Sequence, residues 1–243
     1  MENSNFRAAG SRREVQLVPN FWSKVSLVYL KDLKDEIRTF SHLLGTLVFG
    51  VMLVFIFSYA LQLVELETDR IFPAVLWVSI FFSATLALQR AFSKEHENGT
   101  LDALLLAGGD RGILFLAKFL CSLTVLLILE VIVIPHFWVF LGVNAPNLHL
   151  GLFLASLFLG SWGLAAIGTM LNGMTVQLPG SRLLFPILMF PLLIPLLMGA
   201  ILCSQGALSG EVQPAMGWVY LLLAFDFVFT IVPLLLFDYV LEG

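Results

Sequence analysis

Charged residues are scarce in this 243-residue chain: they make up 12% of it, against about 25% in an ordinary soluble domain. Hydrophobic residues make up 59%, and the mean hydropathy is +0.94. The apolar residues form repeated runs of roughly 20, long enough to cross a bilayer as helices. They do not form the alternating segments of a membrane β-barrel. The composition therefore excludes an ordinary soluble domain and predicts an all-α polytopic membrane protein.

The motifs that hold nucleotides or metals are also missing. The chain has no G-x-x-x-x-G-K-[ST] segment to hold ATP phosphates, no H-E-x-x-H segment for zinc and no G-x-S-x-G turn for a nucleophilic serine. Its two cysteines, Cys121 and Cys203, lie in apolar runs, which indicates inert buried thiols. No basic tract suggests nucleic acid. We therefore expect a non-catalytic chain that binds no metal.

Six apolar runs predict six transmembrane helices, at about 41–64, 71–92, 113–142, 148–171, 183–203 and 215–239. The third run is too long for one straight crossing at 1.5 Å per residue. Pro135 near its far end predicts either a kink or a short re-entrant turn. In the fifth run, Pro186, Pro191 and Pro195 predict a bent helix whose freed carbonyls need partners.

The positions of Lys and Arg predict how the chain is oriented in the membrane. Twelve of the thirteen fall on one side of the predicted spans: Arg7, Arg12, Arg13, Lys24, Lys31, Lys34, Arg38, Arg90, Lys94, Arg111, Lys118 and Arg182. Only Arg70 falls on the other side. Because cytoplasmic segments carry the excess of Lys and Arg, both termini and the segment between spans two and three are expected in the cytoplasm.

The segment before the first span divides into two parts. Residues 1–19 have the character of a disordered cytoplasmic tail, to which we assign no role. Residues 20–40 predict an amphipathic helix at the cytoplasmic membrane surface. Its apolar face holds Phe21, Val25, Val28, Leu33, Ile37 and Phe40, opposite Lys24, Lys31, Lys34, Asp35 and Arg38. The simpler alternative is a solvated basic anchor that only sets topology, and the two are compatible.

The longest charged interval between two spans is residues 89–112, which contain the predicted cytoplasmic loop 93–111. The loop begins with charged residues and a break at Gly99, continues as a short amphipathic run, and ends in a glycine-rich turn. Leu101, Leu104 and Leu105 lie on one face of that run and Asp102 on the other. A short helix of this kind can enter a groove of a partner protein. Around it, Arg90, Glu95 and Glu97 would form a polar rim.

Two carboxylates fall deep inside predicted spans, Glu130 in the third and Asp226 in the sixth. A charge at that depth costs on the order of 2.5–3.5 kcal/mol to insert, so each side chain is expected to face protein or water. One hypothesis is a pathway for protons or substrate. The other is a protonated or hydrogen-bonded contact between helices that fixes packing.

The fourth span is rich in small residues, namely Ser156, Gly160, Ser161, Gly163, Ala165, Gly168 and Thr169. Small residues four apart allow the backbones of two helices to approach closely. This spacing predicts either tight internal packing or an interface between subunits.

The chain resembles the haem exporter protein B family (CcmB) in the order of its elements and in two segments. These are the loop segment FSKEHENGTLDALLLAGGDRGILFLAK and the proline-spaced segment LLFPILMFPLLIPLLMGA. The resemblance covers about residues 20–240. Its most distinctive parts are E-x-G-T-L-D-x-L-L-L at 97–106 and the P-x-x-x-x-P-x-x-x-P spacing. It implies a type-2 ABC permease-like fold in the bacterial inner membrane. The tail 1–19 is longer than expected for the family.

The resemblance also implies partners and a role. The family works in cytochrome c maturation with a separate ATPase subunit (CcmA), two membrane subunits (CcmC and CcmD) and a periplasmic haem chaperone (CcmE). ATP hydrolysis in the partner would drive haem delivery to the chaperone or its release. Loop 93–111 would then contact the ATPase. We expect this chain to bind no cofactor itself, with haem and ATP handled by partners, and a second copy of it is possible.

Three other functions remain open from the residues alone. The chain could be a type-2 ABC exporter subunit for another cargo, such as a lipid or polysaccharide. It could be a proton-coupled secondary transporter that uses Glu130 and Asp226, in which case Glu130→Gln would abolish transport without any dependence on an ATPase. It could also be a structural scaffold that binds the ATPase without coupling to it.

Overall fold

The structure is a computed structural model that describes residues 20–62, 68–89, 111–175 and 181–240. Within these ranges it contains helices and no strand. The helices are α1 (Phe21–Arg38), α2 (Phe40–Gln62), α3 (Thr68–Leu88), α6 (Arg111–Leu141), α7 (Leu150–Thr175), α8 (Ser181–Ser209) and α9 (Val212–Val240).

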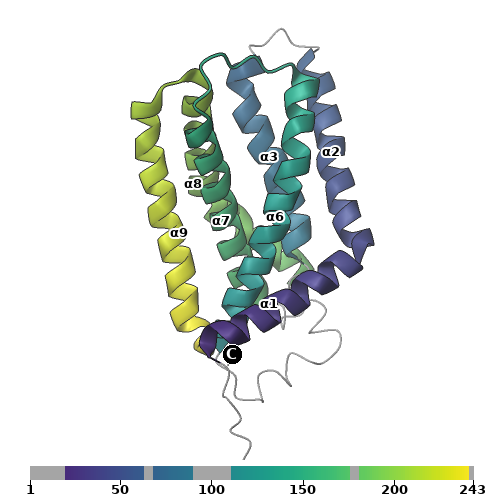
Figure 1. Cartoon of the computed structure of the whole chain (residues 1–243), viewed down its shortest axis with the longest axis vertical. Coiled ribbons are helices and arrows are strands. Elements are labelled where there is room, and N and C mark those ends of the chain that lie inside the picture. Colours follow the sequence, from purple (N-terminus) through teal and green to yellow (C-terminus); the bar gives the residue numbers. More distant parts are fainter. Residues whose placement is uncertain (1–19, 63–67, 90–110, 176–180, 241–243) are drawn as a thin grey trace, which may run out of the picture.

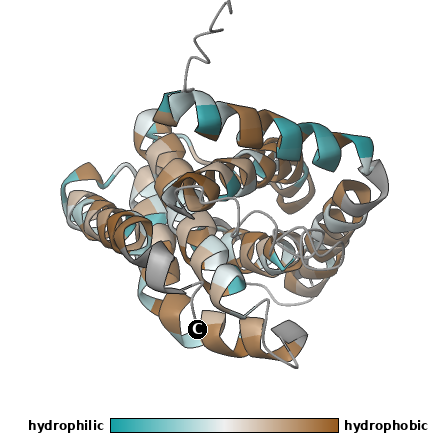
Figure 2. Cartoon of the chain, turned by 90° about the horizontal axis from the view of Figure 1, so that it is seen from below, coloured by the Kyte–Doolittle hydropathy of each residue, from teal (hydrophilic) through white to brown (hydrophobic). Residues whose placement is uncertain are grey.

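Six helices run side by side in alternating directions, and α1 lies across one end of the bundle, where α9 also ends (Figure 1). We call this the α1 end. Each of the six is long and apolar enough to cross a membrane. Seen from the α1 end, hydrophilic residues are concentrated on α1, while the bundle helices are mainly hydrophobic (Figure 2). The predicted all-α fold with six spans and an amphipathic N-terminal helix is therefore confirmed.

The fourth and fifth apolar helices extend further than the sequence predicts, to Thr175 and Ser209 rather than about 171 and 203. The additional turns contain polar side chains, which mark the end of an apolar run. Several of these side chains are buried inside the protein, including Asn172, Thr175 and Ser204. They remain helical because neighbouring helices, and not lipid, surround them.

α6 continues through Pro135 as one helix of 31 residues. The alternative of a re-entrant turn after the main span is therefore wrong. Proline removes a backbone donor and displaces nearby carbonyls, which then need other partners. One such partner is present, because Nδ1 of His136 bonds to the carbonyl of Ile132 at 2.6 Å.

The interior of the bundle is formed mainly by α3, α6 and α7. In the apolar part of α6, 72% of the residues are buried, compared with 22% in the apolar part of α9. The largest fully buried side chain is Trp77 of α3. Its Nε1 donates to Oγ of Ser204 on α8 at 2.9 Å, and Ser204 bonds in turn to Ser156 on α7 at 2.8 Å. This network ties three helices together in the core.

The small residues of α7 serve internal packing. The seven residues predicted to permit close approach are all buried within this single chain. At Gly160, an added Cβ would lie 2.6 and 2.8 Å from Cζ3 and Cζ2 of Trp77, and closer still to Cη2. The absence of a side chain there leaves room for the indole ring.

Candidate functional site

The seven residues predicted to contact an ATPase lie outside the described residues: Arg90, Glu95, Glu97, Gly99, Leu101, Leu104 and Leu105. The structure does describe the two helices that flank the segment. α3 ends at Leu88 and α6 begins at Arg111, both at the α1 end. The candidate site is therefore built from the contacts that hold these two helix ends.

The end of α3 is held by α7. The Asn172 side-chain amide donates through Nδ2 to the carbonyl of Leu88, one of the last carbonyls of a helix that have no intrahelical donor. The Leu88 side chain fills the space left by Gly168, because an added Cβ there would lie 3.1 Å from Cγ of Leu88. Both contacts are buried. These contacts hold the end of α3 against α7.

The start of α6 is held by α1. Val25 of α1 packs in a buried cluster with Ile113 and Ala117 of α6. Beyond this cluster, the hydroxyl of Tyr29 lies 3.1 Å from Oγ1 of Thr124. These contacts follow one face of α1, at a spacing of about one helical turn, and they seat this face on α6.

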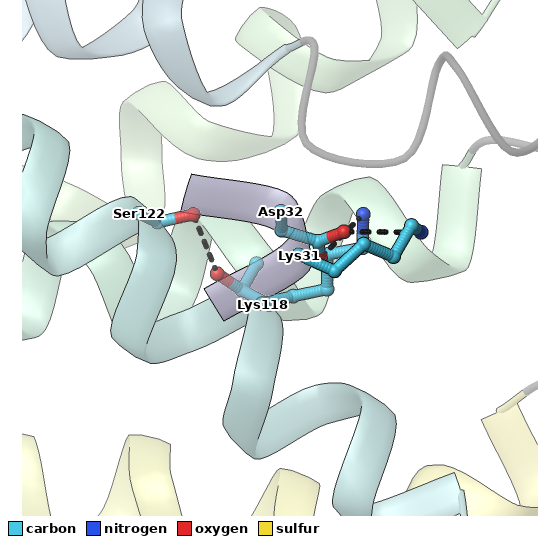
Figure 3. A network of polar contacts seen from close by, with 5 residues as sticks. Lys31, Asp32, Lys118 and Ser122 are labelled. Carbon is cyan, nitrogen blue, oxygen red and sulfur yellow. Dashed lines mark hydrogen bonds and ion pairs between the residues drawn. The ribbon is translucent and has the colours of Figure 1, made fainter. Parts of the chain in front are cut away.

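A buried ion pair completes this contact (Figure 3). Oδ2 of Asp32 on α1 lies 3.0 Å from Nζ of Lys118 on α6, and the two side chains are 8% and 6% exposed. The other oxygen, Oδ1, lies 3.3 Å from Nζ of Lys31, whose side chain is 56% exposed. The pair is thus shielded from solvent. Each charge compensates the other where neither has bulk water.

The sequence reasoning missed this pair. It placed Lys118 among the cations that set orientation, and it assigned Asp32 to neither face of the helix. Of the predicted apolar face, Val25 is buried against α6, whereas Phe21 and Ile37 are exposed at the surface of the protein. A signal was available: Asp32 lies seven residues after Val25, so the two share a helical face.

Deeper in the bundle, Glu130 has a partner on α7. Oγ of Ser161 donates to its Oε1, and the carboxyl group is buried. Towards the α1 end, Oγ1 of Thr169 donates to Oγ of Ser122 at 3.4 Å. The step from Ser122 to Glu130 along α6 equals the step from Thr169 back to Ser161 along α7. The two polar contacts therefore share one antiparallel register.

Glu130 also borders a groove of about 740 Å³ between α6 and α7, whose other lining side chains are apolar or aromatic. A proton pathway needs successive polar groups, and among the described residues that line this groove Glu130 is the only polar one. The geometry favours the hypothesis that Glu130 fixes helix packing.

A prediction follows for the contact between Glu130 and Ser161. Ser161→Ala removes the donor and is expected to lower the free energy of unfolding in detergent by about 0.6 kcal/mol, and by no more than ~1.7, the range of such bonds in membranes. Glu130→Gln keeps a group that can bond to the hydroxyl and should cost less. Ser26→Ala is the matched control, because that exposed hydroxyl bonds only within its own helix. A larger loss in Glu130→Gln than in Ser161→Ala would contradict this role.

Asp226 of α9 differs from Glu130. Its side chain is buried, and within the described residues neither of its carboxyl oxygens has a hydrogen-bond partner. It faces α7, because a Cβ added at Gly163 would lie 2.8 Å from its Oδ1. About one turn further along α9, Nε1 of Trp162 on α7 donates a hydrogen bond to Oγ1 of Thr230 at 2.9 Å. The two intramembrane carboxylates thus have unlike surroundings.

This fold defines a polytopic helical membrane protein with six spans and a helix across one end of the bundle. The family model described as CcmB protein matches residues 23–238. The chain therefore belongs to the CcmB family, and the predicted resemblance is confirmed.

Several curated relatives are named Heme exporter protein B. That of Pseudomonas aeruginosa is 27% identical over 188 residues, 77% of this chain and 82% of the relative. That of Rhodobacter capsulatus is 35% identical over 150 residues, 60% of this chain and 68% of the relative. That of Paracoccus denitrificans is 32% identical over 153 residues, 61% and 67% of the two chains.

Proposed function

We propose that this chain is the membrane permease subunit of a haem-exporting ABC complex in c-type cytochrome biogenesis. Membership of the CcmB family carries the proposal, because the similar proteins are named as haem exporters. The chain itself is non-catalytic, and a separate CcmA-like subunit hydrolyses ATP. The complex delivers haem to a periplasmic chaperone of the CcmE type, or releases the loaded chaperone.

In this proposal the α1 end faces the cytoplasm of a bacterial cell, and both termini lie there. The excess of Lys and Arg near this end supports the orientation. CcmC-like and CcmD-like subunits accompany the chain in the inner membrane, and lipid surrounds the apolar faces of the outer helices. Haem and ATP are held by the partners.

The mechanism starts at loop 93–111, which contacts the ATPase. Closure of the ATPase around nucleotide displaces the loop, and the loop pulls on the end of α3 and the start of α6. The contact of Asn172 with Leu88 passes the movement of α3 to α7. The contacts of Tyr29 and Asp32 pass the movement of α6 to α1. Packed helices of this kind move as blocks, so a small displacement of the loop reaches the opposite end of the bundle.

The loop contact is tested with Leu104→Asp. A charge on the apolar face of the short run should prevent it from entering an apolar groove, so the ATPase recovered with the tagged chain is expected to fall by about tenfold or more, as at an interface hot spot. Insertion of the chain in the membrane should be unchanged. Gln213→Asp is the control, because Gln213 is an exposed residue at the start of α9, at the opposite end of the bundle. Full retention of the ATPase by Leu104→Asp would refute the docking role of the loop.

The cargo is tested by purifying the tagged chain in mild detergent and identifying the proteins that accompany it. A P-loop ATPase together with a tryptophan-rich haem-binding membrane subunit supports haem export. The ATPase without a haem subunit would point to another cargo, and no ATPase at all would refute an ABC complex.

A further inference from the structure

We propose that α1 is part of the transmission element, and that the ion pair of Asp32 and Lys118 locks α1 to the start of α6 so that the two helices move as one body. The proposal deepens the proposed function, on which it rests. Asp32 and Lys118 are positioning residues in it, since they act through the helices that carry them.

The first support is the position of Lys118. It lies about two turns, or ~10 Å, beyond Arg111, where α6 begins. A helix is stiff over that length, so a displacement of the segment before α6 arrives at Lys118 undiminished. Asp32 is its partner on α1, at 3.0 Å.

The second support is the kind of contact. The cluster of Val25, Ile113 and Ala117 is apolar, and apolar surfaces attract without a preferred direction, so they allow one helix to slide on another. A buried ion pair does not, because any slide separates two charges that have no bulk water to replace the lost partner. The pair therefore fixes the register of α1 on α6.

The third support is the connection to α2. α1 ends at Arg38, and α2 begins at Phe40, with only Thr39 between them. The backbone N–H and the hydroxyl of Thr39 both bond to the carbonyl of Asp35, at 3.0 and 2.8 Å. This tight turn leaves little slack. A movement of α1 therefore reaches α2, a bundle helix that is separated in sequence from α6 by α3 and the loop.

The mutational test uses the complete complex in lipid vesicles and measures haem-loaded chaperone formed per ATP hydrolysed. Asp32→Asn keeps the shape of the side chain but removes its charge, and it should lower this ratio by about tenfold while the ATPase stays bound. The charge exchange Asp32→Lys with Lys118→Asp should restore the ratio to within about threefold of the unmodified chain. Lys34→Ala on the same helix should leave it unchanged, because that side chain is exposed and lies outside the ion pair.

The second test does not depend on weakening the fold. In a chain with Cys121 and Cys203 replaced by serine, Val25→Cys and Ala117→Cys are bridged by a short thiol cross-linker. If α1 and α6 move as one body, the bridged complex keeps its product-to-ATP ratio. If bridging lowers the amount of haem-loaded chaperone formed per ATP hydrolysed, and cleavage of the bridge restores it, the proposal is overturned.

The outcomes separate the two proposals. If the unmodified complex forms no haem-loaded chaperone at the expense of ATP, the proposed function fails. If the unmodified complex is active and Asp32→Asn keeps the full ratio, only the lock fails. A low ratio in Asp32→Asn that the charge exchange restores supports the lock when equal amounts of folded complex are recovered from all variants, because an unpaired buried Lys118 can also lower stability.

Discussion

Gly160→Ala is expected to destabilise the bundle by about 3 kcal/mol, at the upper end of the range for overpacked cores. The added methyl group would overlap the distal edge of the Trp77 ring, with Cζ3 and Cζ2 at 2.6 and 2.8 Å and Cη2 closer. The ring has little freedom to retreat. It is fully buried, and its Nε1 is bonded to Ser204.

The expected loss of stability is large because the bundle is surrounded by lipid and not by water. In a bilayer, lipid tails are as apolar as the helix surfaces, so helix association depends on close packing and hydrogen bonds. Displacing α3 from α7 weakens both the close packing and the hydrogen bonds. The ring contact is lost first, and the bonds from Trp77 to Ser204 and from Ser204 to Ser156 lengthen with it.

Thermal unfolding in mild detergent measures the change. Gly217→Ala is the matched control, because an added Cβ at that helical glycine has no atom within 4 Å; it should be neutral or stabilise by up to ~1 kcal/mol. Trp77→Phe removes the distal indole atoms, so the double variant with Gly160→Ala should lose less than the two single changes added together. Strict additivity would show that the methyl group does not meet the ring.

The number of spans could be predicted from the sequence because the hydrocarbon core sets a minimum apolar length. The ends of the helices were less predictable. Polar residues such as Thr169, Asn172 and Thr175 indicate the end of a span, yet here they are buried between helices. Whether a polar residue faces water or protein depends on neighbours that are distant in sequence.

The buried ion pair shows the same limit. Asp32 belongs to a helix with several charged residues, and only its seven-residue spacing from Val25 distinguishes it from Asp35 and Glu36. Its burial follows from the way α1 crosses α6. Glu130 and Asp226 lie inside spans and face protein, as predicted, but the sequence did not identify the groups that surround each of them. The carboxyl group of Glu130 meets Ser161 only because of the register between α6 and α7.

Asp226→Ala is expected to stabilise the protein, although it removes a buried side chain. A buried polar group without a partner costs about 1–3 kcal/mol, and both carboxyl oxygens of Asp226 lack hydrogen-bond partners within the described helices. Alanine removes that cost and leaves a space on the α7 side at Gly163, where the neighbouring side chain of Leu196 can relax. The free energy of unfolding in detergent should therefore rise by roughly 1–2 kcal/mol once the lost packing is subtracted.

Glu211→Ala is the control for removing a carboxylate, because Glu211 is exposed at the turn between α8 and α9 and its loss should change stability by less than ~0.5 kcal/mol. A clear loss of stability in Asp226→Ala would mean that the carboxyl group has a partner in the assembled protein. If stability rises while export activity falls, Asp226 is kept for function, because proteins retain such costly groups where activity needs them. If both are unchanged or improved, the carboxylate carries no proton or substrate, and the secondary-transporter hypothesis loses one of the two residues on which it depends.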